Sequence, residues 1–292
     1  MTHSKAGIIG LGAMGAGMAR NLHAAGVLAA AWNRSPERTA PLAAENLPLV
    51  ASPAEVAARG DVILLSLSAD ADVIEVVEQL RPALRTGQIL VDTSTIEADT
   101  ARHLAMDLAA QGVAYLDAPV SGGSEGAAQG TLAMMVGGGA DAFASARPLM
   151  KIIAAHILHM GGSGSGQATK AVNQIMVAGI NQAVTEALAF AEAEGLDSNK
   201  VIDVVSQGAA GNWFLRHRGP GMVAGDYPPG FRIRLHDKDL AICERMAERH
   251  HVHLHLAGMT RVHYARLIEQ GFGDEDISAL FRFKKTRYAG GE

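Results

Sequence analysis

The stretch Ala6-Gly-Ile-Ile-Gly10-Leu-Gly12-Ala-Met-Gly15 decides the fold of the N-terminal half of this chain. Ala6–Ile9 is a short apolar run that predicts a buried strand, and an alanine-rich stretch suited to an amphipathic helix follows. A lone GxGxxG pattern is weak evidence, but a strand before it and a helix after it favour a dinucleotide-binding turn. In such a turn Gly10 permits the bend, Gly12 lets a pyrophosphate approach the backbone, and Gly15 allows the helix to pack closely on the sheet.

Backbone N–H groups at the start of a helix bind phosphate well because the helix itself does not use them. We therefore expect the whole turn to contact the cofactor, namely Gly10, Leu11, Gly12, Ala13, Met14 and Gly15. The alternative is a glycine-rich turn without a ligand, since 33 glycines in 292 residues can produce such a pattern by chance.

The end of the second predicted strand, Leu28–Trp32, indicates which dinucleotide binds. An acidic residue there would accept hydrogen bonds from the ribose hydroxyls of NAD. Here Asn33-Arg34-Ser35 follow, and no carboxylate comes before Glu37. The arginine can pair with a 2′-phosphate through charge-assisted bonds, and the asparagine and serine add uncharged donors. The pattern favours NADP(H), with NAD(H) possible if Arg34 is only a solvated surface side chain.

Around this motif, short apolar runs alternate with longer helical patterns such as Ala13–Ala25 and Ala98–Gln111. Strands that alternate with helices predict a parallel sheet, and nearly continuous apolar strands indicate that both of its faces are covered. The predicted strands are Ala6–Ile9, Leu28–Trp32, Val62–Leu67, Ile89–Asp92 and Ala114–Asp117, with further candidates at Thr131–Val136 and Ile157–His159.

The pattern changes at the glycine- and serine-rich run 161–166. A helix is expected directly after it and should continue to about Glu194, with Gly195 as its C-cap. Only helical periodicity follows. The sequence therefore predicts an α/β Rossmann-type domain with a parallel sheet over residues 1–162, and an all-α C-terminal domain over residues 163–292 that includes the long helix.

Composition excludes several classes of protein. The length suits two domains, and 48% hydrophobic residues supply enough apolar material for buried cores. A single cysteine, Cys243, cannot form an internal disulfide, which fits a cytoplasmic protein. The net charge of −5 argues against nucleic-acid binding, and no apolar run is long enough to span a membrane.

A second group of candidates combines a loop with one face of the long helix. Asp117-Ala-Pro-Val-Ser121-Gly122-Gly123 follows a strand, and its small residues can offer N–H groups and a hydroxyl to a carboxylate or an oxyanion. Lys170, Asn173 and Gln174 stand at i, i+3 and i+4 on an otherwise apolar helix. A lysine in a cleft can exchange a proton with a hydroxyl or carbonyl oxygen. The alternatives are a tight surface loop and a solvated helix face.

Five histidines near the C-terminus do not predict a metal site. His251 and His255 could share a helix face, and in a strand His253 would join them. Because no HExxH motif and no cysteine pair accompany them, we expect solvated or packed histidines and no metal. The full set is His250, His251, His253, His255 and His263.

Taken in order, these motifs resemble the β-hydroxyacid dehydrogenase family. The matching elements cover nearly the whole chain and are specific as a set: Gly10–Gly15, Asp117–Gly123, Gly130-Thr-Leu132, the Lys170…Asn173 helix and Lys238-Asp239-Leu240. The resemblance implies a Rossmann-type domain, a helical domain built on the long helix, and a dimer or tetramer.

The resemblance also implies roles for individual residues. Lys170 corresponds to the family's catalytic lysine, Ser121, Gly122 and Gly123 to the loop that holds a small carboxylate-bearing substrate, and Asn173 to an asparagine that assists. Gln174 is grouped with these substrate-binding candidates because it shares their helix face. Thr95 and Lys238 correspond to positions that contact the cofactor.

Within the family, the tartronate semialdehyde reductases give the nearest likeness, through Pro229–Leu240 and Asp276–Leu280. The implied reaction is hydride transfer between NADP(H) or NAD(H) and a short hydroxy acid or its semialdehyde. Trp213 lies in a segment that departs from these reductases, and Ser68 stands where the family often has proline. The alternatives are a 3-hydroxyisobutyrate or other semialdehyde dehydrogenase, an imine reductase, and a regulatory protein that binds the dinucleotide without catalysis.

Overall fold

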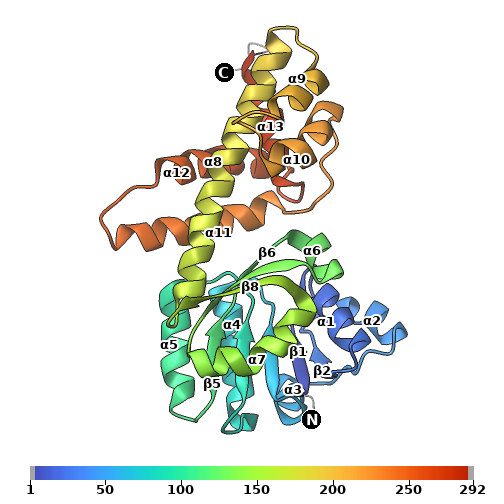
Figure 1. Cartoon of the computed structure of the whole chain (residues 1–292), viewed down its shortest axis with the longest axis vertical. Coiled ribbons are helices and arrows are strands. Elements are labelled where there is room, and N and C mark those ends of the chain that lie inside the picture. The colour runs from blue at the N-terminus through green and yellow to red at the C-terminus, as the bar shows by residue number, and fades with distance from the viewer. Residues whose placement is uncertain (1–3, 289–292) are drawn as a thin grey trace. The chain divides into compact units, whose positions relative to one another are not determined.

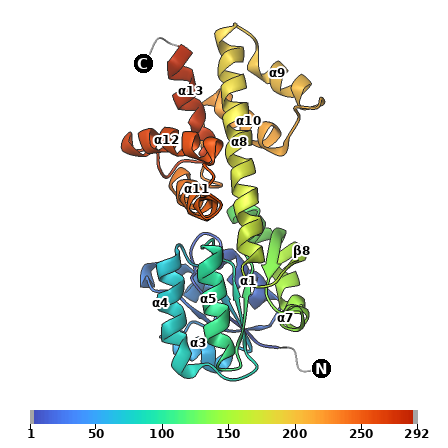
Figure 2. The same cartoon turned by 90° about the vertical axis from the view of Figure 1, so that its left-hand side faces the viewer.

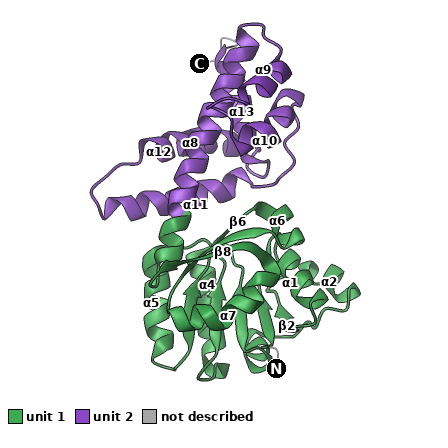
Figure 3. Cartoon of the chain, viewed as in Figure 1, with its two compact units in different colours: residues 1–170 green, residues 171–292 purple. Residues whose placement is uncertain are grey.

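The computed structural model describes residues 4–288, which fall into two compact units that divide between residues 170 and 171 (Figure 3). The boundary predicted from the sequence was at residues 162 and 163. The units divide after Lys170, inside helix α8 (Ser165–Ala193), because the first turns of this helix are bonded to the first unit.

The first unit is built on one sheet of eight strands within its described residues, in the order β2-β1-β3-β4-β5-β7-β6, with β8 beside β7 (Figure 1). β1 to β5 run parallel, so their carboxyl ends meet at one edge. The strands are β1 (Ala6–Ile9), β2 (Leu28–Trp32), β3 (Val62–Leu65), β4 (Ile89–Asp92), β5 (Ala114–Asp117), β6 (Val120–Ser121), β7 (Leu132–Gly137) and β8 (Ala154–Gly161).

Helices cover both faces of this sheet, and a separate hydrophobic core lies under each layer (Figure 2). α1 (Gly15–Ala24), α6 (Gly123–Gln129) and α7 (Ala140–Ile153) pack on one face, and α3 (Pro53–Arg59), α4 (Asp70–Leu80) and α5 (Ala98–Ala109) on the other. Burial on both sides explains why the strands are apolar at almost every position. Shorter elements are α2 (Ala40–Ala44) and the 3₁₀ turns Pro36–Arg38 and Arg81–Ala83.

The second unit is helical throughout its described residues, with a core of its own around Leu188, Tyr264 and Phe281. No helix within residues 4–288 is both long and apolar enough to cross a membrane. After α8 the elements are α9 (Ser198–Val205), α10 (Trp213–Ala224), α11 (Ile233–Glu248), α12 (His255–Glu269), the 3₁₀ turn Ile277–Ala279 and α13 (Leu280–Tyr288).

The predicted fold class, a Rossmann-type α/β domain followed by an all-α domain, is confirmed. The predicted parallel sheet is parallel over β1 to β5, and β7 departs from this by running antiparallel to β5 and β6. The predicted strand Val62–Leu67 ends at Leu65, because the N–H of Leu67 donates to the side chain of Ser94. β6 was missed because two residues are too few to show a periodicity.

Asp92 is a fully buried carboxyl group at the end of β4. Burial raises its pKa from 3.8 to about 6, although Ser94 and Tyr115 stabilise the charged form by hydrogen bonding. The Ser94 N–H donates to Oδ1 at 2.9 Å, and the Tyr115 hydroxyl donates to Oδ2 at 2.6 Å. The folded chain therefore keeps this proton to a higher pH than the unfolded chain does.

The first prediction follows from that difference. As pH rises from about 4 to about 6, the unfolded state loses the Asp92 proton first, so the free energy of unfolding falls. Asp92→Asn removes the charge, keeps the bond from the Ser94 N–H through its Oδ1, and can replace the Tyr115 bond by one in which Nδ2 donates to the hydroxyl oxygen. In the parent protein, this effect lowers the free energy of unfolding by about 3 kcal/mol above pH 6, and we expect Asp92→Asn to remove that loss. Urea unfolding of variant and parent at pH 4 and pH 7 measures this, with the exposed Asp107→Asn as control. Identical pH profiles for parent and Asp92→Asn would contradict it.

Candidate functional site

The carboxyl ends of β1 to β5 bring several predicted site residues to one edge of the sheet. The glycine turn follows β1, Asn33 follows β2, and Thr95 lies in the loop after β4. Because β1 lies between β2 and β3, the chain reverses its direction of travel across the sheet at β1. Ligands of open α/β sheets bind at such a switch point.

The three glycines of the turn have different roles. Gly10 has a φ of +92°, and a Cβ there would lie 2.2 Å from the Ser66 carbonyl oxygen. A Cβ on Gly15 would lie 1.8 Å from the Gly10 carbonyl oxygen, so Gly15 is required for packing inside the turn. A Cβ on Gly12 would meet only the Arg38 guanidinium, at 3.4 Å. Only the Gly12 face is open, as the approach of a pyrophosphate requires.

Asn33 fastens this turn to the end of β2. Its Oδ1 accepts from the Leu11 N–H at 2.8 Å, and its Nδ2 donates to the Ser35 carbonyl at 3.0 Å. Asn33 therefore holds the glycine turn through the backbone N–H of Leu11. Arg34 and Ser35 line a cavity of about 170 Å³ together with Gly10 and Gly12.

The start of helix α8 is bound by the carboxylate of Asp117, at the end of β5. Oδ1 accepts from the Gly164 N–H at 2.8 Å, and Oδ2 accepts from the Gln167 N–H at 2.9 Å. Asp117 is fully buried, and burial raises its pKa above the ordinary value. A Cβ on Gly137 would lie 2.5 Å from Oδ1, so a glycine there leaves room for the carboxylate.

Gln167 ties the first turn of α8 to the loop that carries Thr95. Its Nε2 donates to the Ser94 carbonyl at 2.8 Å, and its Oε1 accepts from the Ile96 N–H at 3.2 Å. These bonds hold the residues on both sides of Thr95. Sequence reasoning missed Gln167, although a polar residue at the start of a largely apolar helix was a usable signal.

Lys170 lies one turn further along α8 and is only 6% exposed. Its Nζ donates to the Val120 carbonyl at 2.8 Å. Because Val120 directly precedes Ser121, the ammonium lies at the start of the Ser121–Gly123 loop. Gly122 has a φ of +132° and precedes α6, so Gly123 begins a helix where the sequence suggested only a loop. The structure thus brings together Lys170 and the predicted substrate loop Ser121–Gly123.

In the second unit, Asn173, Gln174 and Lys238 are joined through Asp239. Asn173 Nδ2 donates to Gln174 Oε1 at 2.8 Å, and Gln174 Nε2 donates to Asp239 Oδ2 at 2.6 Å. The other oxygen of Asp239 lies 2.9 Å from Lys238 Nζ. Gln174 is only 1% exposed, so its amide orients its neighbours. Asp239 was quoted in the Lys-Asp-Leu motif, but its bridging role was not predicted.

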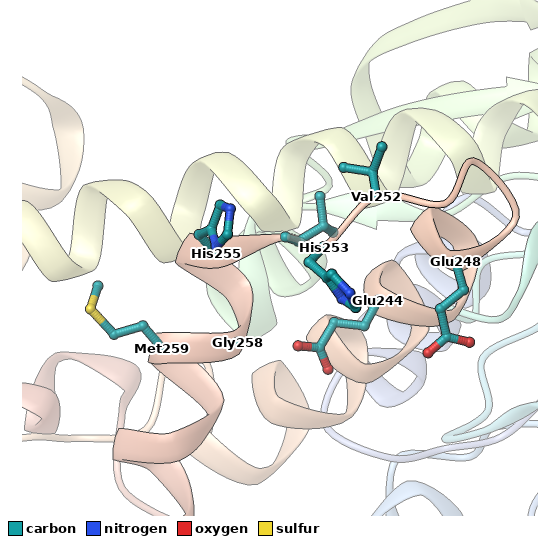
Figure 4. A pocket seen from close by; sticks show the side chains of 8 residues that line it. Glu244, Glu248, Val252, His253, His255, Gly258 and Met259 are labelled. Atoms are coloured by element: carbon teal, nitrogen blue, oxygen red, sulfur yellow. The ribbon is translucent and has the colours of Figure 1, made fainter.

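The histidine segment adopts neither geometry considered from the sequence. α11 ends at Glu248, His251 has a φ of +56° in a turn, and α12 begins at His255. Figure 4 shows His253 and His255 beside a cavity of about 320 Å³ that Glu244 and Glu248 also line. Within residues 4–288, no group of three or more histidine, cysteine, aspartate or glutamate side chains is placed to hold a metal ion.

Two protein families match this chain, one over the α/β part and one over the helical part. Residues 5–162 match the family described as the NAD binding domain of 6-phosphogluconate dehydrogenase. Residues 164–284 match the family described as NAD-binding of NADP-dependent 3-hydroxyisobutyrate dehydrogenase. The chain belongs to the 3-hydroxyisobutyrate dehydrogenase-like β-hydroxyacid dehydrogenases. This β-hydroxyacid dehydrogenase is an NAD(P)-dependent enzyme of the class that acts on hydroxy acids, as the resemblance predicted.

Individual relatives match over nearly the full length of this β-hydroxyacid dehydrogenase. The L-threonate dehydrogenase of Cupriavidus necator is 33% identical, over 94% of each chain. The NAD-dependent L-serine dehydrogenase of Pseudomonas aeruginosa is 32% identical, over 93% of this chain and 95% of its own. The solved structure of 3-hydroxyisobutyrate dehydrogenase from Mycobacterium tuberculosis with L-serine is 31% identical. It has a TM-score of 0.87 and covers 96% of this chain and 98% of that chain.

The second prediction separates two of the glycines. Gly15→Ala forces a methyl group onto the Gly10 carbonyl, and we expect it to lower the free energy of unfolding by more than about 2 kcal/mol. Gly12→Ala meets no backbone atom, so its stability should match the parent. We expect it to weaken NADPH binding at least tenfold, because its methyl group occupies the space of the pyrophosphate. Thermal unfolding and a fluorescence titration measure both effects. Unchanged NADPH binding by Gly12→Ala would contradict the role of this face.

Proposed function

We propose that this chain transfers a hydride between NADP(H) or NAD(H) and a short hydroxy acid or its semialdehyde, with Lys170 exchanging the proton. The observation that carries the proposal is the buried Lys170 ammonium, held at the Val120 carbonyl next to Ser121. A general acid must lie within hydrogen-bond reach of the atom it protonates, and a fixed ammonium beside a substrate loop meets this requirement.

The proposed site works by positioning and proton transfer. The bound nicotinamide supplies or takes the hydride at the substrate carbon. During reduction, Lys170 gives a proton to the carbonyl oxygen, which becomes the hydroxyl, and then recovers a proton from water. During oxidation, the neutral lysine takes the hydroxyl proton. Ser121, Gly122 and Gly123 hold the substrate carboxylate through a hydroxyl and backbone N–H groups, and Asn173 orients the substrate or Lys170.

Tartronate semialdehyde is the substrate we propose first, on the strength of Pro229–Leu240 and Asp276–Leu280. The alternatives are the hydroxy acids named by the relatives, namely threonate, serine and 3-hydroxyisobutyrate. Trp213 begins α10, is 57% exposed, and stacks on His217 at 4.3 Å. Because Trp213 lies in the segment expected from the sequence to depart from the tartronate semialdehyde reductases, the substrate panel includes all four compounds.

For the cofactor we propose a preference for NADP(H), with a cytoplasmic location for the enzyme. Support for the preference comes from Arg34 and Ser35 on the wall of the cavity beside the glycine turn. A guanidinium there can form charge-assisted bonds with a 2′-phosphate. Thr95 and Lys238 are proposed as further cofactor contacts. Gln167 fixes the loop around Thr95, and Asp239 holds Lys238.

The third prediction tests Lys170. Lys170→Ala should reduce kcat by about 10²–10⁴-fold with the best substrate of the panel, because it removes a general acid–base group. NADPH binding should stay within twofold of the parent, since the glycine turn is unchanged. The matched control is Lys151→Ala, which removes an exposed lysine of α7. Near-normal turnover by Lys170→Ala with bound cofactor would contradict the catalytic assignment.

We also propose that the enzyme forms a dimer or tetramer. Val172 and Met176 lie one turn apart on α8 and are 57% and 61% exposed. Leu256 and Met259 of α12 are 47% and 40% exposed, and a Cβ on Gly179 of α8 would lie 3.3 Å from Leu256. Exposed apolar side chains gathered in this way are typical of protein–protein interfaces.

The fourth prediction concerns this apolar surface. Met176→Glu places a charge in the proposed contact, and we expect it to shift the oligomer toward the monomer, as measured by light scattering at micromolar concentration. Met106→Glu is the control, because Met106 is also exposed but lies on α5. A monomeric parent protein would contradict the proposal.

A further inference from the structure

The cavity beside the glycine turn is lined by acidic as well as basic side chains. Asp72 and Glu75 of α4 stand on its wall opposite the end of β2. In a Rossmann-type domain, the end of β2 is where the adenosine ribose of a bound dinucleotide is recognised. The cavity therefore combines the guanidinium expected from the sequence with two carboxylates that no sequence pattern predicts there.

These carboxylates bind Arg34 directly. Arg34 Nη1 lies 3.1 Å from Asp72 Oδ1 and 3.5 Å from Glu75 Oε2. Gln79 Nε2 donates to the other oxygen of Glu75 at 3.1 Å and so steadies that carboxylate. Asp72 and Glu75 are three residues apart and share one face of the helix. The guanidinium proposed to pair with a 2′-phosphate is thus already paired with two acids.

This arrangement affects the two dinucleotides in opposite directions. A 2′-phosphate carries about −1.5 to −2 charges at neutral pH, so nearby carboxylates repel it and compete with it for Arg34. A 2′-hydroxyl is uncharged and can donate a hydrogen bond to a carboxylate oxygen. In NAD-binding Rossmann domains an acid at the end of β2 accepts that bond. In this chain the same chemistry is available from α4.

We propose that Asp72 and Glu75 tune dinucleotide specificity: they restrain Arg34 and offer acceptors to a 2′-hydroxyl, and so reduce the preference for NADPH over NADH. This inference rests on the proposed function only in placing the dinucleotide at the glycine turn. It concerns binding, and it is independent of the role of Lys170 and of the identity of the substrate. Arg38 lines the same cavity and adds a second guanidinium, whereas the ion pairs of Asp72 and Glu75 are with Arg34.

The test compares equilibrium binding of NADPH and NADH, by fluorescence titration or calorimetry, in the parent and in the double variant Asp72→Asn with Glu75→Gln. Both changes keep the shape of the side chain and remove its charge. We expect the NADPH dissociation constant to fall at least tenfold and the NADH constant to stay the same or rise by two- to threefold. The control is Glu78→Gln on the same helix, whose carboxylate pairs with Arg81 at 2.7 Å.

A second variant, Arg34→Gln, tests whether Arg34 is the group for which the 2′-phosphate competes with Asp72 and Glu75. We expect it to weaken NADPH binding at least tenfold and to leave NADH binding within threefold. A ratio of NADPH to NADH affinity that the double variant leaves unchanged within twofold would overturn the role of the acids, while the proposed cofactor site stands. A parent protein that binds neither dinucleotide would overturn the proposed function and this inference together.

Discussion

The carboxylate of Asp117 binds the start of helix α8 through the backbone N–H groups of Gly164 and Gln167. An acid is stabilising at this position because the first N–H groups of a helix lack partners within it and carry partial positive charge. These bonds fix which residues of α8 face the sheet. They direct the Gln167 amide to the loop around Thr95 and bring the Lys170 ammonium to the Val120 carbonyl. The proposed proton donor is thus positioned from the strand edge that carries the proposed cofactor contacts.

Most of the fold could be predicted because its determinants are local. The glycine turn lies between one strand and one helix, and the five parallel strands are nearly continuous apolar runs. The antiparallel direction of β7 could not be predicted, since apolar runs look alike in either direction. β6 has only two residues and shows no pattern of its own.

For the site, the sequence predicted residues but not the bonds between them. Gln167 and Ser94 are 73 residues apart in the chain, and Gln174 and Asp239 are 65 apart, so no local pattern could connect them. The two acids of α4 are the clearest case. They lie 38 and 41 residues beyond Arg34, and an exposed helix is full of such side chains. Only the fold places them opposite the end of β2.

Asn33 shows a further consequence of how the glycine turn is held. Its amide bonds to two backbone groups at once, the Leu11 N–H and the Ser35 carbonyl. An aspartate at this position would turn an oxygen toward that carbonyl and lose the second bond. The end of β2 is thus constrained by bonds to the backbone, whereas Asp72 and Glu75 of α4 are bonded to the side chains of Arg34 and Gln79. Redesign of redox-cofactor usage would meet the least resistance on this helix, away from the backbone bonds that hold the turn.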